Sequence, residues 1–147
     1  MRIVAFALGN PLRGDDGAGR AIAAGLPALV PGLEVVETLE LLPEHAEEVA
    51  AADGVLFLDA AAEGPPGEIR TGPVAARGAR AALLHALLPA ELLGLAQALH
   101  GRAPPAALVT IAGADFSYRE SLSPEVAASL PRARARAREA ARAFTAR

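Results

Sequence analysis

The sequence predicts an α/β protein in which a mostly parallel sheet is covered by helices on both faces. Three observations predict this class. Continuous apolar runs occupy residues 2–8, 54–60 and 106–112, as expected for strands that are buried on both sides. Segments rich in alanine and leucine, with the residues that start and stop helices, lie between these runs. Turn residues separate the segments, and strands that alternate with helices favour parallel pairing through right-handed crossovers.

The first half of the chain alternates strands and helices. Its regular elements are expected to be a strand over 2–8, a helix over 18–29, a strand over 33–39, a helix over 43–52 and a strand over 54–60. The loop GNPLRGDDG (9–17) joins the first strand to the first helix. This is the opening of a strand–helix–strand unit.

The second half continues the pattern after a loop. Residues 61–72 contain GPPG and a short EIRT segment, which is compatible with an edge strand because proline and charge are tolerated there. Three further elements are expected: a helix over 89–100 that stops at Gly101, a strand over 106–112, and a final helix. The final helix starts near Ser123, with a break or kink near Pro131.

Length and composition limit the function. The 147 residues fit one domain over 1–147, with no cysteine to form disulfides, thiolate zinc sites or a thiol nucleophile. All 14 basic residues are arginine, which excludes mechanisms that need a lysine amine. No apolar stretch reaches the roughly 20 residues of a membrane span, and no signal peptide opens the chain, so we expect a cytoplasmic protein without membrane contact.

The arginine-rich stretch RARARAR (132–138) is expected to be a solvated part of the terminal helix. Alternate residues of a helix fall on two faces, the net charge of the chain is −3, and no aromatic platform lies nearby. No nucleic-acid partner is predicted.

Three aspartates follow predicted strands that can be neighbours in the sheet. Asp15 and Asp16 come after the first strand and Asp59 ends the third, so their loops can meet at the carboxyl edge, where open α/β sheets bind ligands. Asp15 is expected to cap the helix that follows it. A second adjacent carboxylate suffers repulsion unless a cation relieves it, which makes Asp16 a candidate metal ligand. Asp59 is either a further ligand or a partner of loop amides.

The three histidines differ in their surroundings. His45 lies among charges in PEHAEE and is expected to be solvated, while His100 at a helix end is expected to interact with the dipole. His85 lies in an apolar segment, where it is either a core or capping residue or a metal ligand. Two carboxylates and one imidazole suit nickel or zinc better than magnesium.

The loop over 9–17 can be compared with two other kinds of site, a dinucleotide-binding loop and the acidic site of a phospho-receiver domain. Its glycines do not fit the dinucleotide pattern, and two aspartates at a helix entrance repel a pyrophosphate. A receiver-like signalling module, phosphorylated on Asp59 and holding a metal, is the alternative function, although the lysine that receivers use is missing.

The loop GNPLRGDDGAG resembles the N-terminal signature of the hydrogenase maturation proteases. The strand ending in LDA, the segment HALLPAELLGLAQALHG and the stretch VTIAGADFSYRESLSPEV resemble this family in order and spacing. The resemblance implies a three-layer αβα sandwich with a twisted, mostly parallel five-stranded sheet. It also implies an endopeptidase that removes a C-terminal extension from the precursor of a [NiFe] hydrogenase large subunit.

The same resemblance assigns roles to residues of this chain. Nickel, carried by the substrate, is recognised by Asp16, Asp59 and His85, and Asp16 is the catalytic candidate beside it. The loop acid, glutamate in some members, is aspartate here, and TLELLPEH stands where many members have a glycine-rich turn. Cysteine is missing and the serines cluster over 117–129 without a partnered histidine, so a different apparatus must carry the proteolysis.

Overall fold

One five-stranded sheet organises the part of the chain that the computed structural model describes, residues 1–78 and 86–145. Its strands are β1 (Ile3–Leu8), β2 (Leu33–Thr38), β3 (Gly54–Ala61), β4 (Ile69–Pro73) and β5 (Ala106–Ala112). They lie in the order β2-β1-β3-β5-β4, and β4 alone pairs antiparallel, along β5. The predicted mostly parallel sheet is confirmed, and the EIRT segment does enter an edge strand.

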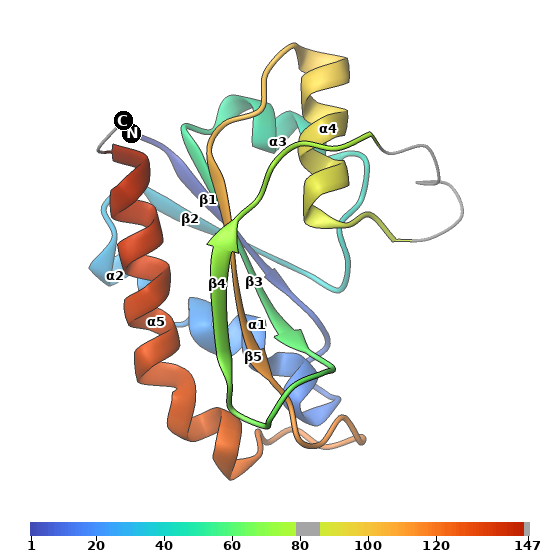
Figure 1. The fold of residues 1–147 in the computed structure, drawn as a ribbon, viewed down its shortest axis with the longest axis vertical. Helices are drawn as coiled ribbons and strands as arrows, with labels where there is room; N and C mark the ends of the chain where they lie inside the picture. The colour runs from blue at the N-terminus through green and yellow to red at the C-terminus, as the bar shows by residue number, and fades with distance from the viewer. Residues whose placement is uncertain (79–85, 146–147) are drawn as a thin grey trace.

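Helices cover both faces of the sheet (Figure 1). They are the 3-10 turn η1 (Gly14–Gly17) and the helices α1 (Ala18–Ala23), α2 (Leu26–Leu29), α3 (His45–Ala51), α4 (Pro89–His100) and α5 (Pro124–Thr145). Helices α1, α2 and α5 pack on one face, and α3 and α4 pack on the other. The predicted three-layer αβα sandwich is therefore confirmed.

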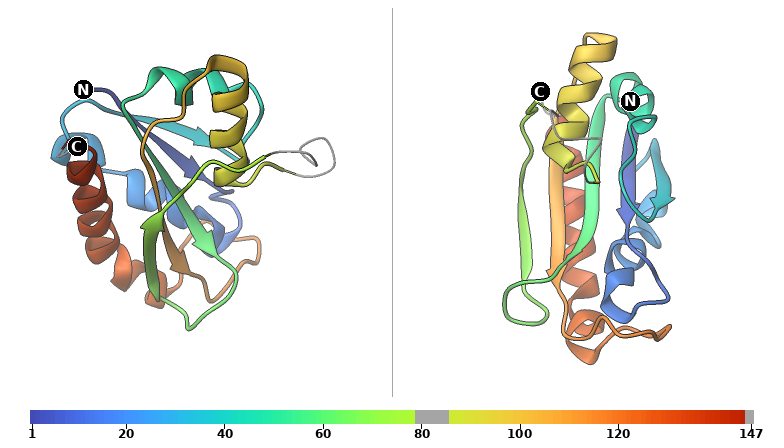
Figure 2. Two further views of the ribbon diagram at one scale, coloured as in Figure 1. Left: turned by 45° about the horizontal axis from the view of Figure 1, so that its top comes forward. Right: turned by 90° about the vertical axis from the view of Figure 1, so that its right-hand side faces the viewer.

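Alternation along β1 divides the core into two layers. Ile3, Ala5 and Ala7 contribute to the layer beneath α1 and α5. The intervening residues Val4, Phe6 and Leu8 face α3 and α4 instead. Since successive side chains of a strand point to opposite faces, a continuous apolar run is the sequence of a strand buried on both sides. The start of the chain and the end of α5 lie at the same end of the molecule (Figure 2).

Two predicted helices differ from the observed ones. The helix expected over 18–29 is split, because Gly25 adopts a left-handed conformation with φ of 87° and Pro27 starts a separate turn, α2. Of the break or kink predicted near Pro131, the break is wrong, since α5 continues through that residue as one helix. Buried Ala133 and Ala137 hold this helix against the sheet beyond the proline.

His45 is not solvated, contrary to the sequence prediction. Its side chain is buried, its Nδ1 accepts a hydrogen bond of 2.9 Å from the Leu42 amide, and its ring meets the ring of Phe6 edge-on. The imidazole therefore closes the turn before α3 and fills the core. His100 is exposed and is the last residue of α4, so its predicted place at a helix end is confirmed, and its interaction with the dipole stays a prediction.

Among the described residues, no helix combines the length and apolar character that a membrane span requires.

Candidate active site

The loop after β1 folds back so that Asp16 lies over its first residues. The Asn10 amide donates a hydrogen bond of 2.7 Å to Asp16 Oδ2, and the Gly9 amide donates to the Thr38 carbonyl of the neighbouring strand. Gly9 has φ of 107°, and a Cβ there would overlap the carbonyl oxygen of Asp16. Only glycine permits this tight return of the chain. The loop thereby fixes the Asp16 carboxylate at the carboxyl edge of the sheet.

Helix α1 then crosses this edge at very short range. A Cβ on Gly19 would overlap the carbonyl oxygen of Leu58 in β3 and would lie 2.7 Å from that of Leu8 in β1. The missing side chain thus lets the helix rest on the ends of two adjacent strands. Pairing of β1 with β3 confirms the predicted neighbourhood of these strands.

Asp59 lies on β3 just beyond the stretch that pairs with β1. Leu58 is the last residue of β3 opposite β1, and Asp59 pairs only with Thr110 of β5. The Asp59 side chain is half-buried, and its Oδ1 accepts a hydrogen bond of 2.8 Å from the Ala60 amide. Because alternate residues of a strand point to the same face of the sheet, Asp59 lies on the face of Phe57, which α3 and α4 cover.

The electrostatics of Asp59 show that it shares its surroundings with Asp16. The pKa of Asp59 is raised to about 6: burial is the main cause, the hydrogen bond from the Ala60 amide opposes it, and the negative charge of Asp16 adds to the rise. A half-buried carboxyl that titrates near neutrality beside a second carboxylate is the pattern expected of an acid–base or cation-binding site. The structure therefore brings two of the three predicted site residues together.

The third predicted residue, His85, lies outside the described residues. Its role as a metal ligand stays a prediction. Among residues 1–78 and 86–145, no group of three histidine or acidic side chains is arranged to hold a metal ion. The described part of the site consists of the acid pair Asp16 and Asp59.

Asp15 turns away from this pair, and the prediction that it caps the following helix is wrong. The side chain is fully buried and makes no capping hydrogen bond to η1 or α1. Its Oδ2 accepts from the amides of Ala114 and Asp115 at 2.7 and 3.0 Å, and its Oδ1 accepts from the Ser123 amide at 2.7 Å. Asp15 therefore binds the loop after β5 and the start of α5.

These hydrogen bonds determine the charge state of Asp15. Burial alone would raise the pKa of this carboxyl, but the amides of Ser123, Ala114 and Asp115 and the Ser123 hydroxyl together outweigh it and lower the pKa. A carboxylate with several N–H donors stays ionised even when buried. Asp15 is thus a fixed structural anion, in contrast to Asp59.

The loop over 113–123 supports the loop that carries Asp16, a contact that the sequence analysis did not predict. Three backbone hydrogen bonds tie it to the loop after β1: Gly14 to Arg119, Asp15 to Asp115, and Arg119 to Leu12. Asp115 forms an ion pair of 2.9 Å with Arg119 within the loop. The sequence shows the two adjacent aspartates, Asp15 and Asp16, and a polar loop after the last strand. Neither feature indicates that the aspartates and this loop are in contact.

The sheet order and the helices on both faces define the class of fold. A sheet of order β2-β1-β3-β5-β4 with helices on both faces and one antiparallel edge strand is an α/β fold, and the acid pair lies at the carboxyl edge, where such folds bind ligands.

Solved structures with this fold include hydrogenase maturation proteases. The chain is similar to the hydrogenase maturating endopeptidase HybD from E. coli, with a TM-score of 0.72, 24% identity, and coverage of 97% of this chain and 93% of that chain. It is similar to the [NiFe] hydrogenase maturation protease HybD from Thermococcus kodakarensis, with a TM-score of 0.71, 24% identity, and coverage of 96% and 99%. For the maturation protease HycI from the same organism, the TM-score is 0.72 at 24% identity, with coverage of 96% and 92%.

These likenesses confirm the predicted resemblance at the level of the fold over nearly the whole chain. A scan against protein-family models found no match, and a search of curated proteins found none either.

Proposed function

We propose that this protein is an endopeptidase that recognises nickel in the precursor of a [NiFe] hydrogenase large subunit and removes its C-terminal extension. One observation carries the proposal: Asp16 and Asp59 share one electrostatic environment at the carboxyl edge of a sheet, and burial with mutual repulsion raises the pKa of Asp59 to about 6. Solved proteins named as maturation proteases share the fold, which supports the same class of reaction here.

The acid pair has the chemistry of a site for a cation carried by the substrate. Within the described residues, one oxygen of each carboxylate is engaged by an amide, Asp16 Oδ2 by Asn10 and Asp59 Oδ1 by Ala60. The other oxygens, Asp16 Oδ1 and Asp59 Oδ2, are the candidate ligands. Two protein carboxylates leave room for ligands from the substrate and for His85, and a divalent cation would relieve the repulsion between the acids.

Recognition of the metal would make the enzyme selective for loaded precursor. A precursor without nickel leaves both carboxylates facing each other without a cation, so it binds more weakly than the loaded form. Nickel therefore belongs to the substrate in this proposal.

Asp16 is the proposed general base for hydrolysis. Its carboxylate takes a proton from a water molecule while the water oxygen bonds to the scissile carbonyl carbon. The carbon–nitrogen bond then breaks, and the proton passes from Asp16 to the leaving amine. The short hydrogen bond from the Asn10 amide holds the carboxylate in place during both transfers.

Mass spectrometry of a hydrogenase large-subunit precursor, incubated with the protein with and without nickel, tests the proposal. We expect loss of a C-terminal peptide only from the nickel-loaded precursor. Because general-base catalysis contributes about 10²- to 10⁴-fold, and because Asp16 is also a candidate ligand of the metal, Asp16→Asn should lower the cleavage rate by at least that factor. Asp59→Asn is expected to abolish cleavage through loss of metal recognition.

A matched control is Asp53→Asn, an exposed aspartate directly before the amino end of the same strand β3. This variant should cleave at the wild-type rate. Wild-type processing by both Asp16→Asn and Asp59→Asn would reject the proposed site, and cleavage of metal-free precursor would reject the role of nickel.

A further inference from the structure

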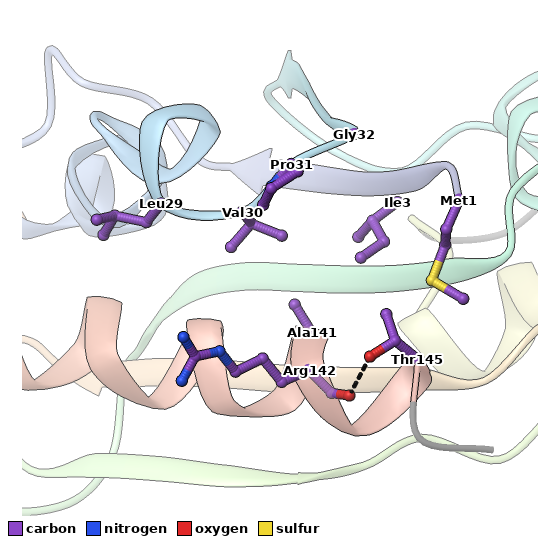
Figure 3. A pocket seen from close by; sticks show the side chains of 9 residues that line it. All are labelled: Met1, Ile3, Leu29, Val30, Pro31, Gly32, Ala141, Arg142 and Thr145. Carbon is purple, nitrogen blue, oxygen red and sulfur yellow. Dashed lines mark hydrogen bonds between the residues drawn. The ribbon is translucent and has the colours of Figure 1, made fainter.

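A cleft between α2 and α5 lies away from the acid pair, at the end of the molecule where the chain begins. Figure 3 shows its first part, where residues 29–32 and the start of β1 face the last turns of α5. This part encloses about 480 Å³, and its walls are mainly apolar, with Met1, Ile3, Leu29, Val30 and Ala141 among them. Arg142 lines its edge, and the Arg142 side chain extends back along the helix toward the preceding turn (Figure 3).

A second cavity of about 360 Å³ adjoins the first and shares Leu29 and Arg142 with it. Arg134 and Arg138 line this cavity, together with Glu139. We call the two cavities together the α2–α5 cleft. It is apolar at one end and basic along the side formed by α5.

The basic side carries charge that the protein does not neutralise. Among the described residues, Arg134, Arg138 and Arg142 form no ion pair. Arg134 donates one hydrogen bond of 2.8 Å, to the Ala21 carbonyl. The Nε atoms of Arg134 and Arg138 are buried without a hydrogen-bond partner, although buried polar atoms are usually satisfied. Arg134 and Arg138 are only half-buried and Arg142 is exposed, so the rest of each guanidinium group can pair with an acceptor from outside.

The spacing of the three arginines distinguishes a peptide from a small anion. Positions 134, 138 and 142 are four residues apart, so they share one face of α5 and form a row about 12 Å long. One phosphate or one carboxylate can engage only part of such a row. A chain segment with several carboxylates matches its length, and guanidinium groups bind carboxylates in a bidentate manner.

We propose that the α2–α5 cleft docks an acidic segment of a partner protein that also carries leucine-like side chains. Its carboxylates pair with Arg134, Arg138 and Arg142, and its apolar side chains fill the cavity beside Ile3 and Val30. The cleft borders the amino end of β1, whereas Asp16 and Asp59 lie at the carboxyl edge of the sheet. The inference therefore goes beyond the proposed peptidase site and does not depend on it.

Fluorescence anisotropy with a labelled peptide tests the docking site. The probe is a helical peptide of about 12 residues, long enough to span the row, built of glutamate and leucine in an amphipathic pattern. Its matched partner has glutamine in place of every glutamate. The charge-reversal variant Arg138→Glu/Arg142→Glu is compared with Arg132→Glu/Arg136→Glu, which changes the same helix and the net charge equally. Arg132 and Arg136 are exposed, and neither lines the cleft.

We expect the wild type to bind the glutamate peptide, with affinity that falls as salt is raised. Arg138→Glu/Arg142→Glu should weaken binding at least tenfold, and Arg132→Glu/Arg136→Glu less than twofold. Asp16→Asn should bind like the wild type. If circular dichroism shows that the reversal variant is unfolded, Arg138→Gln/Arg142→Gln and Arg132→Gln/Arg136→Gln take the place of the two double variants.

Three results would overturn the proposal. The first is equal weakening by both double variants, which indicates only long-range attraction between charges. The second is equal binding of the glutamine peptide. The third is absence of peptide binding, with or without Arg138- and Arg142-dependent sedimentation on phosphatidylglycerol vesicles; such sedimentation assigns the row to a lipid surface instead.

Discussion

Asp15 and Asp16 are consecutive in the chain, yet one anchors the structure and the other faces a second acid. Asp15 is fully buried and surrounded by N–H donors from the loop after β5 and the start of α5. Asp16 and Asp59 each accept one backbone hydrogen bond and share an electrostatic environment. The difference shows that burial alone does not decide the state of a carboxyl group, because the number of donors around it decides whether the charge is stabilised.

Within the loop after β1, Asp15 contributes to stability, whereas Asp16 is available for function. A carboxylate saturated by donors has no oxygen left for a ligand, so its contribution is to hold two loops together. A carboxyl that is short of donors is unfavourable for folding and available for a cation or a proton. Substitutions of Asp15, Asp59 and Asp16 test this contrast.

Asp15→Asn is expected to have the largest effect on stability. Asparagine keeps one acceptor oxygen and places an NH₂ group against amides that also donate. Because hydrogen bonds to charged groups contribute about 1.5–3 kcal/mol each, loss of more than one should lower the free energy of unfolding by about 3 kcal/mol or more. Urea denaturation at pH 7 measures the change, with Asp53→Asn as the exposed control.

The effect of Asp15→Asn should depend on pH with a defined sign. The folded pKa of Asp15 is lowered from its ordinary 3.8, so its contribution to stability is present above that value and is lost as the pH falls through the lowered pKa. The difference between wild type and variant should therefore shrink in acid. An equal stability of the two proteins at pH 7 would contradict the anchoring role.

Much of the fold follows from the sequence because two-sided burial leaves a plain pattern. The runs over 2–8, 54–60 and 106–112 predict β1, β3 and β5, and the same strands form the centre of the sheet. The neighbourhood of β1 and β3 brings Asp16 and Asp59 together as expected.

What the sequence did not reveal depends on contacts between distant segments. The hydrogen-bond donors to Asp15 are backbone amides 99 to 108 residues away, and an amide has no residue-specific signature. His45 is surrounded by charges in the sequence, whereas its burial comes from Phe6 on a different element. Gly25 and Pro27, in contrast, did carry the signal that splits the helix expected over 18–29.

Asp59→Asn should act in the opposite direction to Asp15→Asn. Because the folded pKa of Asp59 is raised from 3.8 to about 6, ionisation destabilises the folded protein progressively between these two pH values. One pKa unit corresponds to about 1.4 kcal/mol, so the variant should gain up to about 3 kcal/mol at pH 8, while losing the activity proposed above. Asparagine can keep the hydrogen bond from the Ala60 amide.

Urea denaturation of the metal-free protein at pH 8 and at pH 4, with a chelator present, measures this gain. The gain should be lost at pH 4, where Asp59 is already protonated. A loss of stability at pH 8 would show that the carboxylate contributes to folding and would remove the contrast with Asp15.

The smallest expected effect concerns the coupling between the two site acids. Asp16→Asn removes a negative charge near Asp59, so the pKa of Asp59 should fall from about 6, but by less than burial raises it, because burial is the larger cause. Carbon-detected NMR titration of the Asp59 carboxyl measures this shift, and Asp53→Asn should leave it unchanged. If Asp16→Asn also leaves the pKa of Asp59 unchanged, the two carboxylates do not form a pair, and a cation held between them loses its physical basis.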